Sequence, residues 1–276
     1  MATLHPLISL LPLVALLGTG CFGAAAEPPA LLTTPSYDSL TPHLSLPPAF
    51  EDRLLLYHGF GRADGQAEIR RPTVTQVGTL PVAEGFRDQG ALTGNGRLLQ
   101  VRSPAFSPHG PLTVCFWWAM QEDPKPENCF GLFHLGGKRG IVSHFSRGKG
   151  QWCALKRPAA ILQVYYFDGI KNVNGIYDRD LLAHVDLRAG VWHHTALVFR
   201  GASLVEVYTD GRKAWQARVR GRSFRESDGL RDITIGTRGT PPMAIDEVIV
   251  LRRALTPDDI RTYVEAIRQM REVHYP

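Results

Sequence analysis

Residues 191–219 read VWHHTALVFRGASLVEVYTDGRKAWQARV, and this stretch decides the fold class. It contains three runs rich in β-branched and aromatic residues, which predict strands at Trp192–Phe199, Ser203–Thr209 and Lys213–Val219. Asp210–Gly211 lies between the second and third runs, and an Asp-Gly pair favours a tight hairpin turn because glycine adopts positive φ freely. The stretch therefore predicts consecutive antiparallel strands.

Short apolar runs separated by turn residues continue on both sides of this stretch. Glycine, proline, asparagine and aspartate separate them at short intervals, as they do in all-β domains. Residues 61–90 are rich in glycine and weakly periodic, so mainly irregular structure is expected there. The further predicted strands are Leu54–Phe60, Thr73–Val77, Arg97–Val101, Leu112–Met120, Phe130–His134, Gly140–Phe145, Trp152–Leu155, Ile161–Phe167, Asp232–Ile235 and Ala244–Leu251.

One helix is predicted, over Thr256–Met270. Thr256 suits the N-cap position and Pro257 the first helical position, while Asp258 and Asp259 place negative charge in the first turn. Many short strands followed by a terminal helix indicate an all-β fold, a two-sheet antiparallel sandwich, and not an α/β sheet.

Composition and charge narrow the classes of partner. The chain has 276 residues, of which 44% are hydrophobic and 21% charged, enough for one sizeable β domain. The net charge of +5 favours acidic partners such as anionic polysaccharide, nucleic acid or a membrane surface. The sequence contains no helix-turn-helix pattern, zinc-finger spacing or RNA-binding aromatic motif, so nucleic-acid binding is not expected.

The first residues predict export. Leu7–Leu17 is an apolar run about the length of a signal-peptide core and too short for a membrane span. The small residues Ala24–Ala26 then suit a signal peptidase, which predicts a signal peptide over residues 1–26. Residues 27–49, rich in proline, serine and threonine, predict a linker, and residues 50–272 the folded domain.

A lipoprotein signal is the alternative for the same segment. Leu17-Gly18-Thr19-Gly20-Cys21 is similar to a degraded lipobox, in which lipidation would fall on Cys21. Gly18 stands where such a signal has leucine or a similar residue. An uncleaved anchor is a third alternative. No later stretch is long enough to cross a membrane, so an extracellular or envelope-associated protein is expected.

Export implies an oxidising compartment, in which cysteines can pair. Three cysteines follow Cys21, so at most one bridge forms among them. Cys129 and Cys153 lie in adjacent segments of the predicted meander, and we expect them to form the bridge. Cys115 lies in the middle of an apolar strand and is expected to be a buried free thiol.

Four segments carry a resemblance to a known family. Leu112–Trp118, Val191–Phe199, Val207–Gly211 and Ile245–Ile260 resemble, in order, four motifs of laminin-G-like domains of the concanavalin A-like lectin/glucanase group. The resemblance covers about residues 50–270. It implies a jelly roll of two antiparallel sheets, with Leu54–Phe60 beside the closing strand Ala244–Leu251 and the helix packed outside the sheets. The family includes lectin-like and adhesive modules as well as glycosidases, so the fold does not fix the function.

No catalytic pattern accompanies the resemblance. Glycosidases of this fold place carboxylates at alternating positions of one strand, so that they point the same way. Glu226 and Asp228 are the only internal look-alike, and Gly229 follows with no third acid, which favours a loop. The sequence also lacks serine-hydrolase and zinc-protease motifs. We therefore expect a non-enzymatic protein.

Three groups of residues are candidates for a metal site. Adjacent strand residues such as His193 and His194 point to opposite faces, so we expect one packed and one exposed histidine and no metal pair. Asp246 and Glu247 suit hydrogen bonds that hold turns, with calcium as the alternative. The oxygen-rich loop with Asp168, Asn172, Asn174, Asp178 and Asp180 favours Asx turns over calcium. No cofactor is predicted, and calcium stays open.

The candidate ligand-binding residues are Arg218, Arg220 and Arg222. They share one strand face with Gln216, and successive residues of that face lie about 6.5–7 Å apart. Such a stripe suits the repeated sulfates or carboxylates of an acidic polymer, which the planar arginine fork binds well. Alternatively, the charges only keep an exposed sheet edge from pairing.

These observations favour an exported, non-catalytic binding or adhesion module, whose partner is a polysaccharide or a cell-surface glycan or protein. Two alternatives stay open. One is a polysaccharide-cleaving glycoside hydrolase of the same fold, and the other is a purely structural envelope protein.

Overall fold

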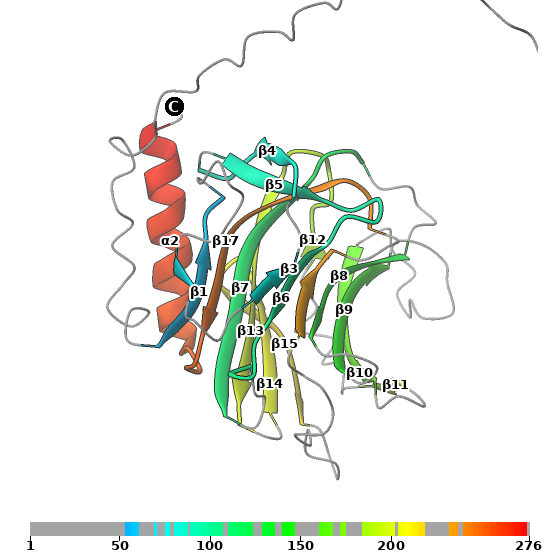
Figure 1. Ribbon diagram of the computed structural model, residues 1–276, viewed down its shortest axis with the longest axis vertical. Helices are drawn as coiled ribbons and strands as arrows, with labels where there is room; N and C mark the ends of the chain where they lie inside the picture. Colours follow the sequence, from blue (N-terminus) through cyan, green and yellow to red (C-terminus); the bar gives the residue numbers. More distant parts are fainter. Residues whose placement is uncertain are drawn as a thin grey trace, which may run out of the picture. The chain divides into compact units, whose positions relative to one another are not determined.

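The computed structural model describes residues 53–60, 69–70, 75–77, 80–87, 89–106, 110–123, 129–135, 140–146, 160–167, 172–174, 184–201, 204–218, 232–236 and 240–274. All of them belong to the unit Pro42–Pro276. They form two antiparallel sheets and a C-terminal helix (Figure 1), which confirms the predicted all-β sandwich.

Within the described residues, the larger sheet, here sheet A, has nine strands, with β7 in the centre between β13 and β17. β5 pairs with β17, and β4 pairs with β5. The strands on the main path are, in spatial order, β15 (Arg212–Arg218), β14 (Leu204–Thr209), β13 (Trp192–Arg200), β7 (Pro111–Met120), β17 (Met243–Leu251), β1 (Leu54–His58) and β2 (Ile69–Arg70), and the two off it are β4 (Val82–Glu84) and β5 (Gln89–Thr93).

The second sheet, sheet B, carries eight strands, of which β12 pairs with β10 beside the main path. In spatial order they are β11 (Asn172–Asn174), β10 (Ala160–Phe167), β9 (Gly140–Ser146), β8 (Cys129–Leu135), β16 (Asp232–Ile235), β6 (Leu99–Arg102) and β3 (Thr75–Val77), with β12 at His184–Val185.

Most of the predicted strands are present, and the predicted pairing of the first strand with the closing strand is confirmed. Tyr57 pairs with Ile249 and His58 with Val248. The expectation of mainly irregular structure over residues 61–90 is wrong in part, because β2, β4 and the start of β5 lie there. β4 and β2 are only two or three residues long, too short to show a period. The predicted strand Trp152–Leu155 lies outside the described residues.

The main core lies between the two sheets, and every second residue of β7 points into it. Val114, Phe116 and Trp118 are buried in the inter-sheet cluster, together with residues of β13, β14, β17, β8, β6 and β16. Trp118 also donates its Nε1–H to the hydroxyl of Thr195 at 2.9 Å, so its polar atom is satisfied in the core. Full burial of each such apolar side chain stabilises the fold by about 1.5–3 kcal/mol.

A second apolar cluster lies on the outer face of sheet A, under the helix. The helix α2 spans Pro257–His274 and buries Ile260, Val264 and Ile267 against this face. Positions four and three residues apart share one helix face, so these three form its apolar stripe. Cys115 and Trp117, the residues of β7 that alternate with the inter-sheet core, lie on the other side of the contact. The predicted helix outside the sheets is thus confirmed.

The start of α2 is a capping box. The Asp259 N–H donates to the Thr256 hydroxyl at 3.1 Å, and the Thr256 N–H donates to the Asp259 carboxylate at 2.9 Å. Each of these bonds satisfies a backbone donor that the helix leaves without an internal partner. The predicted N-cap at Thr256 is therefore correct.

The Asp-Gly turn between β14 and β15 is present as predicted. Asp210 has φ of 50° and Gly211 φ of 79°, the left-handed values that a two-residue hairpin of this hand requires. Gly211 also lies against α2, where an added Cβ would be 3.6 Å from the Cα of Arg261.

The cysteines are partly tested. Cys115 is a buried free thiol, as expected, and its burial raises the pKa well above that of an exposed cysteine. Cys153 and the side chain of Cys129 lie outside the described residues, so their bridge stays a prediction. Cys21 also lies outside them. Within the described ranges, no helix combines the length and apolarity that a membrane span needs.

The connection from β17 to α2 depends on the buried hydroxyl of Thr113. It donates to the Arg253 carbonyl at 2.6 Å and accepts the Leu255 N–H at 3.1 Å. We expect Thr113→Val to lower the free energy of unfolding by about 2 kcal/mol, because a near-isosteric side chain leaves two backbone groups without partners. Urea unfolding measures this. The exposed Thr75→Val on β3 is the control, and equal midpoints for the two variants would contradict the role of Thr113.

Candidate functional site

The predicted ligand stripe begins at the end of the edge strand β15. Arg218 is the last residue of that strand and pairs with Leu204 of β14. β15 is the terminal strand of sheet A within the described topology. The side chain of Arg218 and the whole of Arg220 and Arg222 lie outside the described residues, so the stripe stays a prediction.

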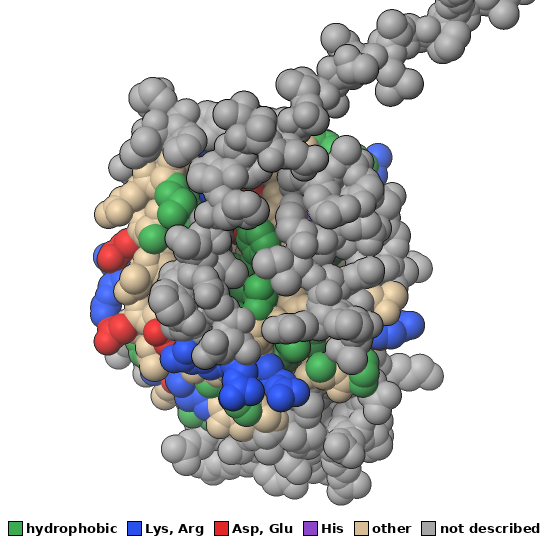
Figure 2. Space-filling model, turned by 60° about the vertical axis from the view of Figure 1, so that its left-hand side comes forward, with side chains coloured by type: hydrophobic (Ala, Val, Ile, Leu, Met, Phe, Trp, Pro, Cys, Tyr) green, Lys and Arg blue, Asp and Glu red, His purple; other side chains and the backbone are tan. Residues whose placement is uncertain are grey.

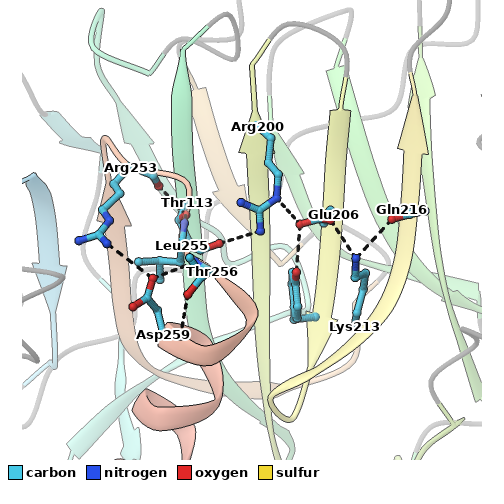
Figure 3. A network of polar contacts seen from close by, with 10 residues as sticks. Thr113, Arg200, Glu206, Lys213, Gln216, Arg253, Leu255, Thr256 and Asp259 are labelled. Carbon is cyan, nitrogen blue, oxygen red and sulfur yellow. Dashed lines mark hydrogen bonds and ion pairs between the residues drawn. The ribbon is translucent and has the colours of Figure 1, made fainter.

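Next to this edge, the structure brings together a polar network that the sequence did not single out. Glu206 of β14 is at its centre and is 6% exposed as a side chain. Its Oε2 accepts the Arg200 Nε–H at 2.5 Å and the Tyr208 hydroxyl at 3.0 Å, and its Oε1 accepts from Lys213 Nζ at 3.0 Å (Figure 3). One buried carboxylate therefore holds two cations, one on each neighbouring strand.

The network extends in both directions across the face. Arg200 Nη2 donates to the carbonyl of Leu255 at 2.9 Å, in the segment that leads into α2. At the other end, Lys213 Nζ donates to Gln216 Oε1 at 3.4 Å. Figure 3 shows these residues side by side from the start of the helix to β15.

The charges of the network follow from burial and from its bonds. Burial raises the pKa of Glu206, but the bonds from Lys213, Arg200 and Tyr208 lower it more, so that its pKa lies below the usual value. Burial lowers the pKa of Arg200, while the bond to Glu206 raises it to above the ordinary value. The Glu206 carboxylate is thus ionised at neutral pH. Together with the cations of Arg200 and Lys213 it leaves one net positive charge.

Basic side chains also gather around the segment that leads into α2. The N–H of Arg252 donates to the carbonyl of Arg53 at 2.8 Å, so these two exposed residues are neighbours. Arg253 lies 3.7 Å from the Asp259 carboxylate. Figure 2 shows the molecule turned so that the side with the helix comes forward. Lys and Arg side chains gather in the lower part of this face, with acidic side chains nearby.

The two histidines of β13 are both buried, so the expectation of one exposed histidine is wrong. His193 is covered by the segment before β13 and bonds the Asp186 carbonyl through Nε2 at 2.7 Å and Asp210 through Nδ1 at 2.8 Å. His194 is covered by α2, with the Tyr263 ring centroid at 5.5 Å. Both are buried because the helix covers the outer face of this strand at His194, while the preceding segment covers His193.

Asp210 joins the hairpin turn to the helix as well as to β13. Its carboxylate accepts the His194 N–H at 2.9 Å and a bond from Arg268 of α2 at 3.0 Å. Burial raises the pKa of Asp210, but the bond and charge of His193, with further help from His194 N–H and Arg268, leave the pKa below its usual value. The carboxylate therefore has a structural use.

Asp246 and Glu247 of β17 hold the turn before β5. Asp246 Oδ2 accepts the Phe86 N–H at 2.8 Å and the Arg87 N–H at 3.2 Å. Glu247 lies at a bulge with φ of 51°, and its Oε1 accepts bonds from Arg87 Nη1 at 3.2 Å and the Tyr57 hydroxyl at 3.3 Å. Burial, reinforced by the neighbouring Glu247, raises the pKa of Asp246 well above the usual value.

These contacts favour the structural interpretation of the acid pair over calcium. Both side chains are almost fully buried, at 1% and 2% exposure, beneath the turn that they bind. Throughout the part of the chain that the structure describes, no group of three His, Cys, Asp or Glu residues is placed to hold a metal ion. The other candidate residues with side-chain oxygens lie outside the described residues or have no described side chain: Asp168, Asn172, Asn174, Asp178, Asp180, Glu226 and Asp228.

His194 is buried without a hydrogen-bond partner for either ring nitrogen among the described residues. Burial lowers its pKa to about 3, an effect that Asp210 opposes and Arg268 reinforces. In the unfolded chain the His194 pKa has its ordinary value of 6.5. Between that pH and about pH 3, the unfolded chain therefore binds a proton at His194 and the folded chain does not. The folded state should lose stability as the pH falls from about 6.5 toward about 3.

We expect His194→Phe to flatten this acid dependence, because the ring packing is kept and the titrating group is removed. Between about pH 7.5 and about pH 4.5, the parent should lose about 2–3 kcal/mol of unfolding free energy more than the variant does. Urea unfolding at the two pH values measures both losses. Equal losses in parent and variant would show that His194 does not cause the dependence.

Comparisons with known proteins agree with this fold. The family model of the concanavalin A-like lectin/glucanases superfamily matches residues 93–261. Domain 4 of AbnA, a GH43 extracellular arabinanase from Geobacillus stearothermophilus solved with arabinotriose, is 17% identical with a TM-score of 0.52, over 77% of this chain and 98% of that chain. No curated protein matches the sequence.

Two toxin binding domains have a similar fold. The binding domain of Paraclostridial Mosquitocidal Protein 1 is 12% identical with a TM-score of 0.53, over 78% of this chain and 52% of that one. The botulinum neurotoxin serotype C1 binding domain is 10% identical with a TM-score of 0.55, over 78% and 52%. The present chain thus spans about half the length of these toxin domains, and at such identities the likeness concerns the fold alone.

The family model matches more than half of the sequence, and the chain folds as a two-sheet sandwich with the expected motifs. The chain therefore belongs to the concanavalin A-like lectin/glucanase superfamily.

Proposed function

We propose that the protein is an exported, non-catalytic binding module that attaches to an acidic polysaccharide through the β15 edge of sheet A. The observation that carries the proposal is the charge along β13–β15. Residues 192–218 include four Lys or Arg residues and two acidic ones. Both acids, Glu206 and Asp210, are engaged in bonds within the fold, and the four basic residues outnumber them by two.

Arg212 and the sequence that follows β15 supply positive charge. Arg212 at the start of β15 is exposed and has no ion-pair partner among the described residues. In the sequence, Arg218 is followed by Arg220, Arg222 and Arg225 before the next acid, Glu226. Arginines repeated along a strand suit a polymer with repeated sulfate or carboxylate groups.

A non-catalytic role is supported by what the carboxylates of β14 and β17 do. A glycosidase needs two carboxyl groups on either side of the bond to be cleaved, open to the substrate. Glu206, Asp246 and Glu247 are nearly inaccessible, and each accepts bonds from backbone or cationic groups. Cleavage of the bound polysaccharide is the competing function, and a reducing-end assay on every glycan tested detects it.

The comparisons support sugar as the class of ligand. A similarly folded domain of an extracellular arabinanase was solved with arabinotriose, and other similar folds are toxin binding domains.

Export of the present chain rests on residues 1–26, with a mature start at Glu27 or at lipidated Cys21. An intact mass of the native protein that matches either start is expected, and a mass that retains Met1 would contradict both.

The test of the ligand edge is the triple variant Arg218→Ala, Arg220→Ala, Arg222→Ala. Loss of three positive charges should weaken binding to polygalacturonate or heparin about tenfold, and binding by the parent should weaken steeply with salt. Calorimetric titration of the purified exported protein measures both.

The matched control removes the same charge elsewhere, with Arg97→Ala, Arg102→Ala and Arg188→Ala, three exposed arginines outside β13–β15. It should bind nearly as the parent does. If the control loses as much affinity as the triple variant, the edge has no special role. If the parent binds no acidic glycan, the proposed function is wrong.

A further inference from the structure

We propose that Arg200 and Lys213, held in place by the buried Glu206, form a subsite on the outer face of sheet A for one carboxylate or sulfate group of the bound polysaccharide. This inference rests on the proposed function and adds a defined contact to it. The subsite is built on three adjacent strands, with Arg200 on β13, Glu206 on β14 and Lys213 on β15 (Figure 3).

The exposure of the three charges differs in a way that favours an anion. The side chain of Glu206 is 6% exposed, whereas those of Arg200 and Lys213 are 27% and 34% exposed. Solvent therefore meets two cations, while the acid that holds them lies beneath. A ligand anion could contact both cations without approaching the Glu206 carboxylate closely.

Both cations keep hydrogen-bond donors beyond their bonds within the network. Arg200 has five N–H donors, and its bonds to Glu206 and Leu255 use two of them. Lys213 has three, and its bonds to Glu206 and Gln216 use two. Donors therefore remain on two neighbouring side chains, as bidentate contact with a carboxylate or sulfate requires.

Glu206 acts as a positioning residue in this arrangement. It fixes two long side chains on rigid strands before any ligand arrives, which reduces the ordering that binding would otherwise require. Tyr208 donates to the same carboxylate and fixes it in turn. The acids at the start of α2 are themselves engaged, Asp258 with Arg261 and Asp259 with the N-cap, so they do not compete for Arg200.

The subsite continues toward the predicted stripe. Gln216 pairs with Glu206, and Arg218 pairs with Leu204, one two-residue step along β14. That step is about 6.5–7 Å along a strand. A single extended chain of acidic sugars could therefore pass from the subsite to the position of Arg218.

The alternative is that the network only ties β13, β14 and β15 to the segment before α2, so that an anion responds to net charge alone. The two views predict opposite effects of Glu206→Gln on the affinity for an anion. If only net charge matters, removal of an acid strengthens the binding of an anion. If Glu206 positions the cations, its loss should weaken the binding about threefold to tenfold despite the added positive charge.

The experiment compares Glu206→Gln with Glu265→Gln, which makes the same charge change at an exposed residue of α2. Lys213→Gln, with Arg102→Gln on sheet B as its control, tests the subsite if Glu206→Gln fails to fold. The probes are polygalacturonate for carboxylate, heparin for sulfate, neutral dextran and duplex DNA, each titrated calorimetrically against the full-length exported protein, with thermal unfolding measured alongside.

We expect Glu206→Gln and Lys213→Gln to weaken acidic-glycan binding, Glu265→Gln to leave it equal or slightly stronger, and dextran not to bind. The polygalacturonate and heparin arms show which anion the subsite prefers. Stronger binding by a folded Glu206→Gln, or unchanged binding by Lys213→Gln, overturns the subsite while the edge function stands. DNA binding as tight as that of the glycans overturns the polysaccharide assignment, and no binding of acidic glycan by the parent overturns both proposals.

Discussion

Strand β7 lies in the middle of sheet A, and the residues Leu112–Met120 are each at most 3% exposed. Side chains alternate along a strand, so this run of apolar residues needs a cover on both sides. Sheet B covers Phe116 and Trp118 from within the sandwich. The outer side, with Cys115 and Trp117, is covered by α2, whose apolar stripe replaces water over the middle of the sheet. The position of the helix is therefore a consequence of the sequence of β7.

That cover also buries polar groups that a sheet open to solvent would leave wet, and some of them have hydrogen-bond partners within the fold, whereas Trp117 Nε1 has none among the described residues. Asp246 accepts three backbone N–H groups, from Phe86, Arg87 and Glu247. Arg268 binds Asp210 and lies over the Trp117 ring at 5.6 Å, so the helix contributes charge as well as apolar surface. The ring nitrogens of His194 have no hydrogen-bond partner in the described part of the chain. Burial keeps this ring neutral, and a buried neutral ring costs less free energy than a buried charge.

The sequence predicts the architecture well where the signals are local or repeat a family motif. The sequence predicts the Asp210–Gly211 turn, the N-cap at Thr256 and the long strands, because turn chemistry, capping and alternation depend on neighbouring residues. The hairpin of β4 and β5 was not, since β4 is three residues long and is held by pairing with β5, which itself pairs with β17, far along the chain. The burial of His194 was missed because periodicity along β13 does not say that a helix 70 residues later will lie on it.

The candidate site shows the same division. Sequence spacing picks out Arg218 as a member of a basic strand, but it does not show which cations a buried acid holds. Arg200 and Glu206 come together only when β13 and β14 pair in the observed register, in which Val198 faces Glu206. Their placement separates two effects that a count of charges combines. In the proposed binding mode, the net charge of the edge would attract an anionic polymer at a distance and would be screened by salt, whereas contacts fixed at short range by Glu206 would depend on geometry. A surface with only the first effect would bind any polyanion, so discrimination among acidic ligands would require side chains that the rigid strands hold in place, as Glu206 holds Arg200 and Lys213.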